Sequence, residues 1–136
     1  MNRPSLRKID HLHLYVEALE DSIDWYGKVL GFKPISKSVE QPVFLYNDDK
    51  SIALALFEEN SPPSSGIAFN VSPAEFENWI AYFDQNRAKH KVIEHDSVYS
   101  IYLSDPSGNQ HELACSEKSE LKNRSIDAYL FLCNDN

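Results

Sequence analysis

The sequence has little cysteine and glycine, and it has no long apolar run. Two cysteines, Cys115 and Cys133, are too few for a disulfide framework and form no CxxC metal pair. No GxGxxG, GxxxxGK[ST] or GxSxG motif occurs, which argues against a phosphate-cradling loop and a serine-hydrolase elbow. No segment approaches the roughly 18–20 apolar residues of a membrane span, and the first residues lack the apolar core of a signal peptide. We therefore expect a cytoplasmic protein with reduced thiols and no membrane partner.

Basic residues are also scarce. The 136 residues include 13 Lys+Arg against 21 Asp+Glu, so the formal net charge is −8. Neutralising phosphates requires a basic face, and we expect no nucleic-acid partner. A cationic ligand, or a small molecule held in a polar pocket, suits this balance better. The hydrophobic fraction of 42% and the length are typical of one globular domain.

What is present is a repeated pattern of elements. Residues 9–16 and 66–71 alternate between apolar and polar side chains, which predicts strands. An amphipathic helix follows each, the first ending at Gly31 and the second starting at the capping box Ser72-Pro73-Ala74-Glu75. Three strand candidates follow each helix, at 33–39, 43–47 and 52–57, and again at 91–95, 98–104 and 110–115. The order strand, helix, three strands thus occurs twice, with a period of roughly 55 residues.

This repeat predicts the fold class. A unit of roughly 55 residues cannot bury both faces of its sheet, so two units must pair. We predict an α+β fold in which two βαβββ modules, about 8–60 and 65–116, form a curved mixed sheet around a cup within one domain, 1–116. Residues 117–136 form a C-terminal extension without a counterpart in the repeat. Its apolar stretch 126–132 is expected to dock, either as a helix over a sheet edge or as a subunit contact.

The polar sides of the alternating strands define the candidate site. The opposite sides are almost wholly apolar, so a polar face enclosed by curvature is expected to bind a ligand. The side chains predicted on this face are His11, His13, Tyr15, Ala68, Asn70, Ser100, Tyr102, Gln110, Glu112 and Ala114. Within this set, we predict substrate-binding roles for His13, Tyr15, Asn70, Ser100 and Gln110.

His11 and Glu112 have the chemistry of metal ligands. Imidazole nitrogen with carboxylate oxygen suits Zn, Fe, Mn or Ni. His13 faces the same way as His11, but residues two apart on a strand are separated by roughly 7 Å at their Cα atoms. We therefore interpret His13 as a hydrogen-bonding wall residue in preference to a ligand.

The other histidines and the cysteine of the last strand are interpreted as structural. His111 points to the core side of its strand and is expected to be packed or at a subunit contact. His90 and His95 lie in loop regions and are expected to be solvated. Cys115 falls on a core face, which is a poor place for a nucleophile. The acidic residues 58–59 are expected to form an exposed tip at a strand end.

Three segments carry a resemblance to a known family: IDHLHLYV, DSIDWYGKVLGF and YLSDPSGNQHEL. The chain resembles the vicinal oxygen chelate superfamily, which holds glyoxalase I, extradiol dioxygenases, fosfomycin-resistance thiol transferases and bleomycin-resistance proteins. The match spans roughly residues 8–116. It implies paired βαβββ modules that curve around a cup and are often completed as a homodimer.

The resemblance also implies a divalent metal cofactor. His11 matches the ligand of the first strand, and Glu112 matches the ligand of the last strand. The ligand at the start of the second module, usually a histidine, falls on Gly66, which cannot coordinate. The ligand of glyoxalase type on the fourth strand falls near Ala53 or Leu54. These departures argue against a standard glyoxalase I site.

Three functions stay open from the sequence. The first is a divalent-metal-dependent enzyme of lyase, dioxygenase or transferase type, acting on a small molecule with Glu112 and Tyr102 as candidate catalytic residues. Tyr102 would orient the substrate or donate a proton. The alternative is a metal-free small-molecule or antibiotic-binding protein of the bleomycin-resistance type, which the acidity and Gly66 favour. The third is an interaction module with a vestigial cup. We lean slightly to metal chemistry.

Overall fold

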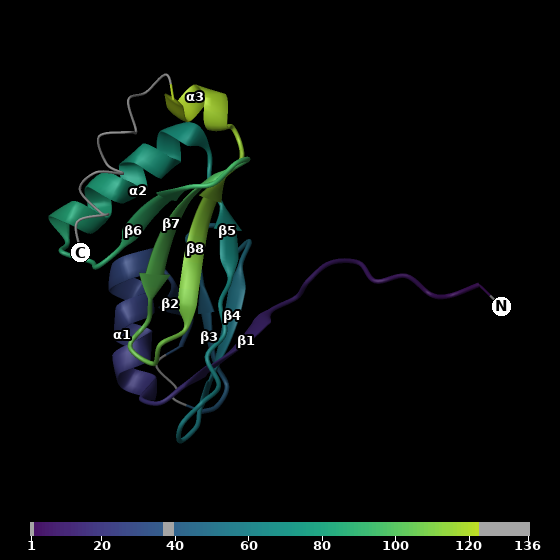
Figure 1. The fold of residues 1–136 in the computed structure, drawn as a ribbon. Helices are drawn as coiled ribbons and strands as arrows, with labels where there is room; N and C mark the ends of the chain where they lie inside the picture. Colours follow the sequence, from purple (N-terminus) through teal and green to yellow (C-terminus); the bar gives the residue numbers. More distant parts are fainter. Residues whose placement is uncertain (1, 37–39, 123–136) are drawn as a thin grey trace. The chain divides into compact units, whose positions relative to one another are not determined.

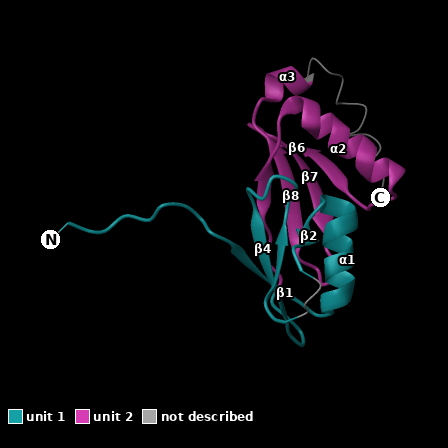
Figure 2. Ribbon diagram, turned by 180° about the vertical axis from the view of Figure 1, so that it is seen from behind, with its two compact units in different colours: residues 1–63 teal, residues 64–136 magenta. Residues whose placement is uncertain are grey.

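The computed structural model describes residues 2–36 and 40–122. The chain divides into two compact units, residues 1–63 and residues 64–136, which Figure 2 distinguishes by colour. Each unit holds a four-stranded mixed sheet and a long helix in the order strand, helix, three strands (Figure 1). The predicted α+β class and the twofold repeat of this order are confirmed.

Unit 1 runs from β1 to β4. Its elements are β1 (Leu12–Val16), α1 (Leu19–Leu30), β2 (Lys33–Pro34), β3 (Val43–Tyr46) and β4 (Ala53–Glu58). The sheet has the strand order β1-β4-β3-β2, in which β1 is parallel to β4 and the other pairs are antiparallel. Its core includes Leu14, Leu45, Leu54 and Leu56, each at most 1% exposed.

Local signals set both ends of α1. Gly31 ends the helix with φ of 77°, the left-handed conformation that favours glycine, as predicted. The N–H of Phe32 then donates to the carbonyl of Tyr26 at 2.9 Å. At the other end, the N–H of Leu19 donates to Oε2 of Glu58 from β4, also at 2.9 Å. The carboxylate of Glu58, although exposed, therefore anchors the start of the helix.

Unit 2 runs from β5 to α3. Its elements are β5 (Ala68–Asn70), α2 (Pro73–Gln85), β6 (Lys91–Glu94), β7 (Tyr99–Ser104), β8 (Gln110–Cys115) and α3 (Lys118–Lys122). The strand order is β5-β8-β7-β6, with β5 parallel to β8. The N–H of Glu75 donates to Oγ of Ser72 at 3.3 Å, so the predicted capping residue is in place. The stretch 126–132 and Cys133 lie outside the described residues.

Several predicted strands are longer than the observed ones, including the strand predicted at 33–39, of which β2 covers only Lys33–Pro34. The first strand of each repeated unit is also shorter than predicted. The strand predicted at 9–16 begins only at Leu12, because its pairing with β4 starts at Leu54 and Ile9 is 75% exposed. The strand predicted at 66–71 is assigned over Ala68–Asn70. At residues 9–11 the alternation of side chains continues beyond the paired part of the chain, whereas Ser65, Ile67 and Val71 on either side of β5 still form backbone hydrogen bonds with β8.

The turn between β7 and β8 holds the beginning of β5 in place. The buried carboxylate of Asp105 accepts hydrogen bonds from the backbone N–H of Asn109 and from its side-chain amide, both at 2.8 Å. Oδ1 of Asn109 in turn accepts the N–H of Ser65 at 2.9 Å, and the carbonyl of Ser65 accepts the N–H of Gln110 at 2.9 Å. These bonds press Gly66 so closely against β8 that a Cβ built there would lie 2.0 Å from the carbonyl oxygen of Gln110.

This close approach predicts a large cost for any side chain at residue 66. Gly66→Ala should lower the free energy of unfolding by about 1–3 kcal/mol, because backbone atoms must shift to admit one methyl group. The measurement is chemical denaturation followed by tryptophan fluorescence.

Gly27→Ala is the matched control. A Cβ on Gly27, inside α1, would make only an ordinary contact at 3.5 Å. This variant should be more stable by about 0.5–1 kcal/mol, since alanine favours the helix. Equal stability of the two variants would contradict the close packing at Gly66.

Candidate functional site

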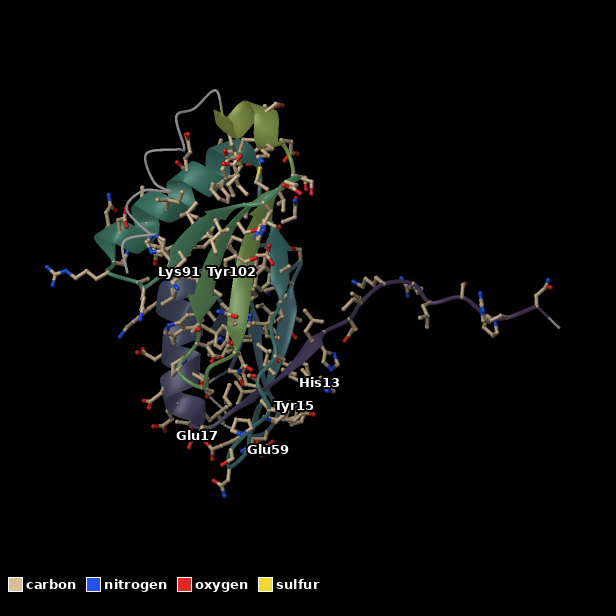
Figure 3. All side chains as sticks on the ribbon, viewed as in Figure 1. His13, Tyr15, Glu17, Glu59, Lys91 and Tyr102 are labelled. Carbon is tan, nitrogen blue, oxygen red and sulfur yellow. The ribbon has the colours of Figure 1, made fainter. Side chains whose placement is uncertain are left out.

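The first strand presents the predicted polar face. Leu14 and Val16 are buried on one side of β1, whereas His13 is exposed and Tyr15 is half-buried on the other. Figure 3 labels His13 and Tyr15 on this strand. His11 lies just before β1, and its side chain is 29% exposed. The predicted division of this strand into two faces is therefore confirmed.

His11 and His13 are in direct contact through their rings. Their Nε2 atoms are 3.0 Å apart, and the ring centroids are 4.9 Å apart. The separation of the two residues along the strand therefore does not keep the ring nitrogens apart. We call these two side chains the histidine pair.

Asp10 orients the histidine pair. Its Oδ2 lies 2.7 Å from Nδ1 of His11, and the hydrogen bond to His11 is the main cause that lowers the pKa of Asp10. The hydrogen-bond network assigns the proton of neutral His11 to Nδ1, so that Nε2 of His11 carries a lone pair directed at His13. A carboxylate behind an imidazole in this way is the usual second-shell support of a metal-binding histidine.

Aromatic rings flank the histidine pair on both sides. The ring of Phe44 from β3 meets His11 edge-on at 5.1 Å, and His13 meets Phe57 from β4 at 5.0 Å. Phe57 is also stacked with Tyr15 at 5.4 Å. Sequence reasoning missed both phenylalanines. The alternation of residues within strands 43–47 and 52–57 could have indicated them. Which side of the sheet these rings lie on follows only from the strand register, which pairs Tyr15 with Phe57.

In unit 2, the strand register aligns one row of residues across the sheet. Glu112 on β8 pairs with Ala68 on β5 and with Tyr102 on β7. Tyr102 pairs in turn with Lys91 on β6. Tyr102 and Lys91 are labelled in Figure 3. We call Ala68, Glu112, Tyr102 and Lys91 the cross-strand row.

Glu112 is held by a residue that we expected to touch substrate. Oγ of Ser100 donates to Oε1 of Glu112 at 2.6 Å, and Ser100 is fully buried. The serine hydroxyl therefore fixes the rotamer of the carboxylate, and the structure gives it no exposed surface. Glu112 itself is half-buried.

A pocket of about 280 Å³ lies beside the cross-strand row in unit 2. It is lined by Lys89, Lys91, Tyr102, Leu103, Ser104 and Gln110. The hydroxyl of Tyr102 also lies 2.9 Å from Nε2 of His95. His95 is exposed, as expected for a loop residue, but the contact of its ring with a candidate site residue was not foreseen. Alternation could not indicate it, because His95 follows the end of β6.

The other predicted residues divide into exposed and packed positions. Asn70 is exposed, with its amide 3.4 Å from the carbonyl oxygen of Ala114. His111 is fully buried, as predicted; burial lowers its pKa, and its Nδ1 accepts the N–H of Ile67 at 3.2 Å. The prediction that His90 is solvated is wrong. Its side chain is 9% exposed because the ring packs against Phe83 on α2.

The donor set fits a metal ion only in part. Over residues 2–36 and 40–122, no cluster of three or more His, Cys, Asp or Glu side chains is gathered as for a metal. The histidine pair does supply two imidazole nitrogens, of which one has its tautomer fixed by Asp10. At the position of the expected second-module ligand, Gly66 leaves no room for a side chain.

Comparison with known proteins places the chain in a family. Residues 8–113 match the family model of the Glyoxalase/Bleomycin resistance protein/Dioxygenase superfamily. The chain therefore belongs to this superfamily, in agreement with the resemblance to vicinal oxygen chelate proteins. None of the described helices is long and apolar enough to span a bilayer.

Two relatives with the same name match most of this chain. Metallothiol transferase FosB from Staphylococcus saprophyticus is 27% identical over 118 residues, covering 79% of this chain and 76% of the relative. FosB from Staphylococcus haemolyticus is 29% identical over 120 residues, covering 79% and 83%.

Solved structures show the same fold. The fosfomycin resistance protein FosX from Listeria monocytogenes has a TM-score of 0.69 at 17% identity, covering 86% of this chain and 99% of that one. Lactoylglutathione lyase from Agrobacterium tumefaciens has a TM-score of 0.66 at 22% identity, covering 86% and 98%.

The environment of Cys115 predicts a protected thiol. Cys115 is fully buried, and burial raises its pKa, so little of it is thiolate at neutral pH. In a Cys133→Ser variant, the remaining thiol should react with a disulfide reagent at pH 7 more than about tenfold more slowly than free cysteine. Denaturant should abolish the difference. Fast reaction in the folded state would contradict the burial of this side chain.

Proposed function

We propose that the protein is a divalent-metal-dependent enzyme of transferase type that joins a thiol to a small-molecule acceptor. The proposal is supported by membership of the superfamily and by relatives named as metallothiol transferases at 27–29% identity. The observation that carries it is the orientation of His11 by Asp10, which leaves Nε2 available as a ligand. The family resemblance further supports Glu112 as a candidate ligand in unit 2.

The chemistry of such a transfer is balanced without a redox change. The sulfur of the thiol forms a bond to an acceptor carbon, a carbon–oxygen bond breaks, and the proton of the thiol ends on the released oxygen. A bound divalent ion would supply Lewis-acid polarisation of that oxygen. Zn, Fe, Mn and Ni all suit imidazole and carboxylate ligands.

The chain's own residues would position the substrate. In unit 2, the hydroxyl of Tyr102 is both a donor and an acceptor, lies at the pocket and contacts His95, so it can hold or protonate a substrate oxygen. Gln110 offers an amide at the same pocket. In unit 1, His13 and Tyr15 lie beside Phe57 and would offer an aromatic surface to a substrate. In unit 2, Asn70 offers an exposed amide. The resemblance also supports a homodimer, which sedimentation can test.

The metal-free binding protein is the less favoured function. The two FosB relatives are named as metallothiol transferases, and a His11 that donates from Nδ1 to Asp10 has its Nε2 lone pair available for a metal ion.

Loss of Glu112 gives a direct test of metal dependence. The wild-type protein, purified without chelators, should bind about one Mn²⁺ or Zn²⁺ per chain, and Glu112→Gln should weaken that binding by at least about tenfold. Disappearance of free cysteine in the presence of fosfomycin, a first acceptor suggested by the relative from Listeria, should require the metal. Binding is measured by calorimetry, and thiol loss by a colorimetric assay.

Glu59→Gln is the matched control, because Glu59 is an exposed glutamate outside the proposed ligands. It should bind the metal like the wild type. A wild-type protein that binds neither ion would show that the metal-dependent function is wrong.

A further inference from the structure

We infer that His13 is the second imidazole ligand of this protein, so that the histidine pair chelates the metal from a single strand. The inference deepens the proposed function and rests on it for the presence of a metal. It assigns to His13 a role that the family resemblance gives to residue 66 and that our sequence interpretation did not favour.

The first step is that residue 66 cannot take the role. The carbonyl oxygen of Gln110 occupies the space of a side chain, at 2.0 Å from an ideal Cβ of Gly66. Backbone hydrogen bonds on both sides fix this approach, from Gln110 to Ser65 at 2.9 Å and from Glu112 to Ile67 at 3.0 Å. A ligand could return to residue 66 only if this pairing changed.

The second step is the spacing of the ring nitrogens. Zinc–nitrogen bonds of about 2.0–2.1 Å, at angles between octahedral and tetrahedral, place two ligand nitrogens about 2.9–3.4 Å apart. The Nε2 atoms of His11 and His13 are 3.0 Å apart. The hydrogen-bonded distance between the two Nε2 atoms therefore falls within the range that two ligands of one ion require.

The third step is protonation. With the Nδ1 proton of His11 donated to Asp10, the contact between the Nε2 atoms is a hydrogen bond given by His13. His13 is exposed, so an ion can reach its ring from solvent.

The fourth step is the support around the pair. Phe44 meets the ring of His11 and Phe57 meets the ring of His13, which limits the rotamers of both imidazoles. Together these contacts favour a preorganised pair over two independent surface histidines.

The test is the affinity of purified variants for Zn²⁺, measured by competition with a chromogenic chelator. His11→Gln and His13→Gln should each weaken binding by more than the about 10–100-fold that is typical of a second-shell change, and Asp10→Asn should weaken it by about 10–100-fold. Glu59→Gln, a change of an exposed side chain outside the pair and outside the unit 2 pocket, should bind Zn²⁺ like the wild type. Circular dichroism checks that each variant is folded.

A second readout follows the ring nitrogens themselves. Nitrogen-15 NMR should show that Zn²⁺ shifts the Nε2 signals of both His11 and His13, while the Nδ1 of each carries a proton. A His13→Gln protein that binds Zn²⁺ as tightly as the wild type, while His11→Gln does not, would overturn this inference and leave the proposed function standing. A wild-type protein without Zn²⁺ affinity would overturn both. Zn²⁺ binding at the pair without thiol transfer would overturn only the proposed function.

Discussion

The contact on which the unit 2 sheet depends is the close approach of Gly66 to the carbonyl of Gln110. The buried carboxylate of Asp105 accepts two hydrogen bonds from Asn109 and so holds the β7–β8 turn. Oδ1 of Asn109 in turn accepts the N–H of Ser65, one residue before the glycine. The parallel pairing of β5 with β8 then follows directly along the chain. One turn therefore sets the register of an entire edge strand, and the same register removes the side chain that the family resemblance expects at residue 66.

The consequences differ for the fold and for the chemistry. A glycine costs the sheet little, because the backbone hydrogen bonds beside it are intact. A metal site, in contrast, loses one donor, and no backbone arrangement replaces an imidazole. Glycine at residue 66 is therefore compatible with the fold, but a metal site would need its missing ligand from another residue. The histidine pair lies at the start of β1 in unit 1, whereas this contact lies in unit 2.

Sequence reasoning predicted most of the fold, because its signals are local. Alternation in β1 identified the buried Leu14 and Val16, and Gly31 marked the end of α1 through its backbone conformation. Side-chain geometry was less accessible. The 3.0 Å contact between His11 and His13 depends on rotamers that the rings of Phe44 and Phe57 select, and those rings come from other strands. Spacing along one strand contains no information about them.

Burial was the second quantity that pattern could not supply. The alternation of side chains predicts Ser100 on the polar face of its strand. Ser100 is nevertheless fully buried, and it donates a hydrogen bond to Glu112. His90 lies in a loop, yet Phe83 covers its ring. In both cases a neighbour from another secondary-structure element decides the environment. Parity assigns a face to a side chain, but only the packing above that face decides whether the side chain meets solvent.

The net charge of the whole chain likewise does not describe the environment of one local site. The −8 charge argues against nucleic acid, since that argument concerns the long-range field of the whole chain. It does not extend to the polarity of one pocket. The unit 2 pocket is lined by Lys89 and Lys91, and no carboxylate is among its lining residues. Charges farther away than roughly 8–10 Å are screened, so the residues beside a pocket matter more to its ligand than the average charge of the chain. The net charge therefore does not determine which charge a ligand of this pocket would carry.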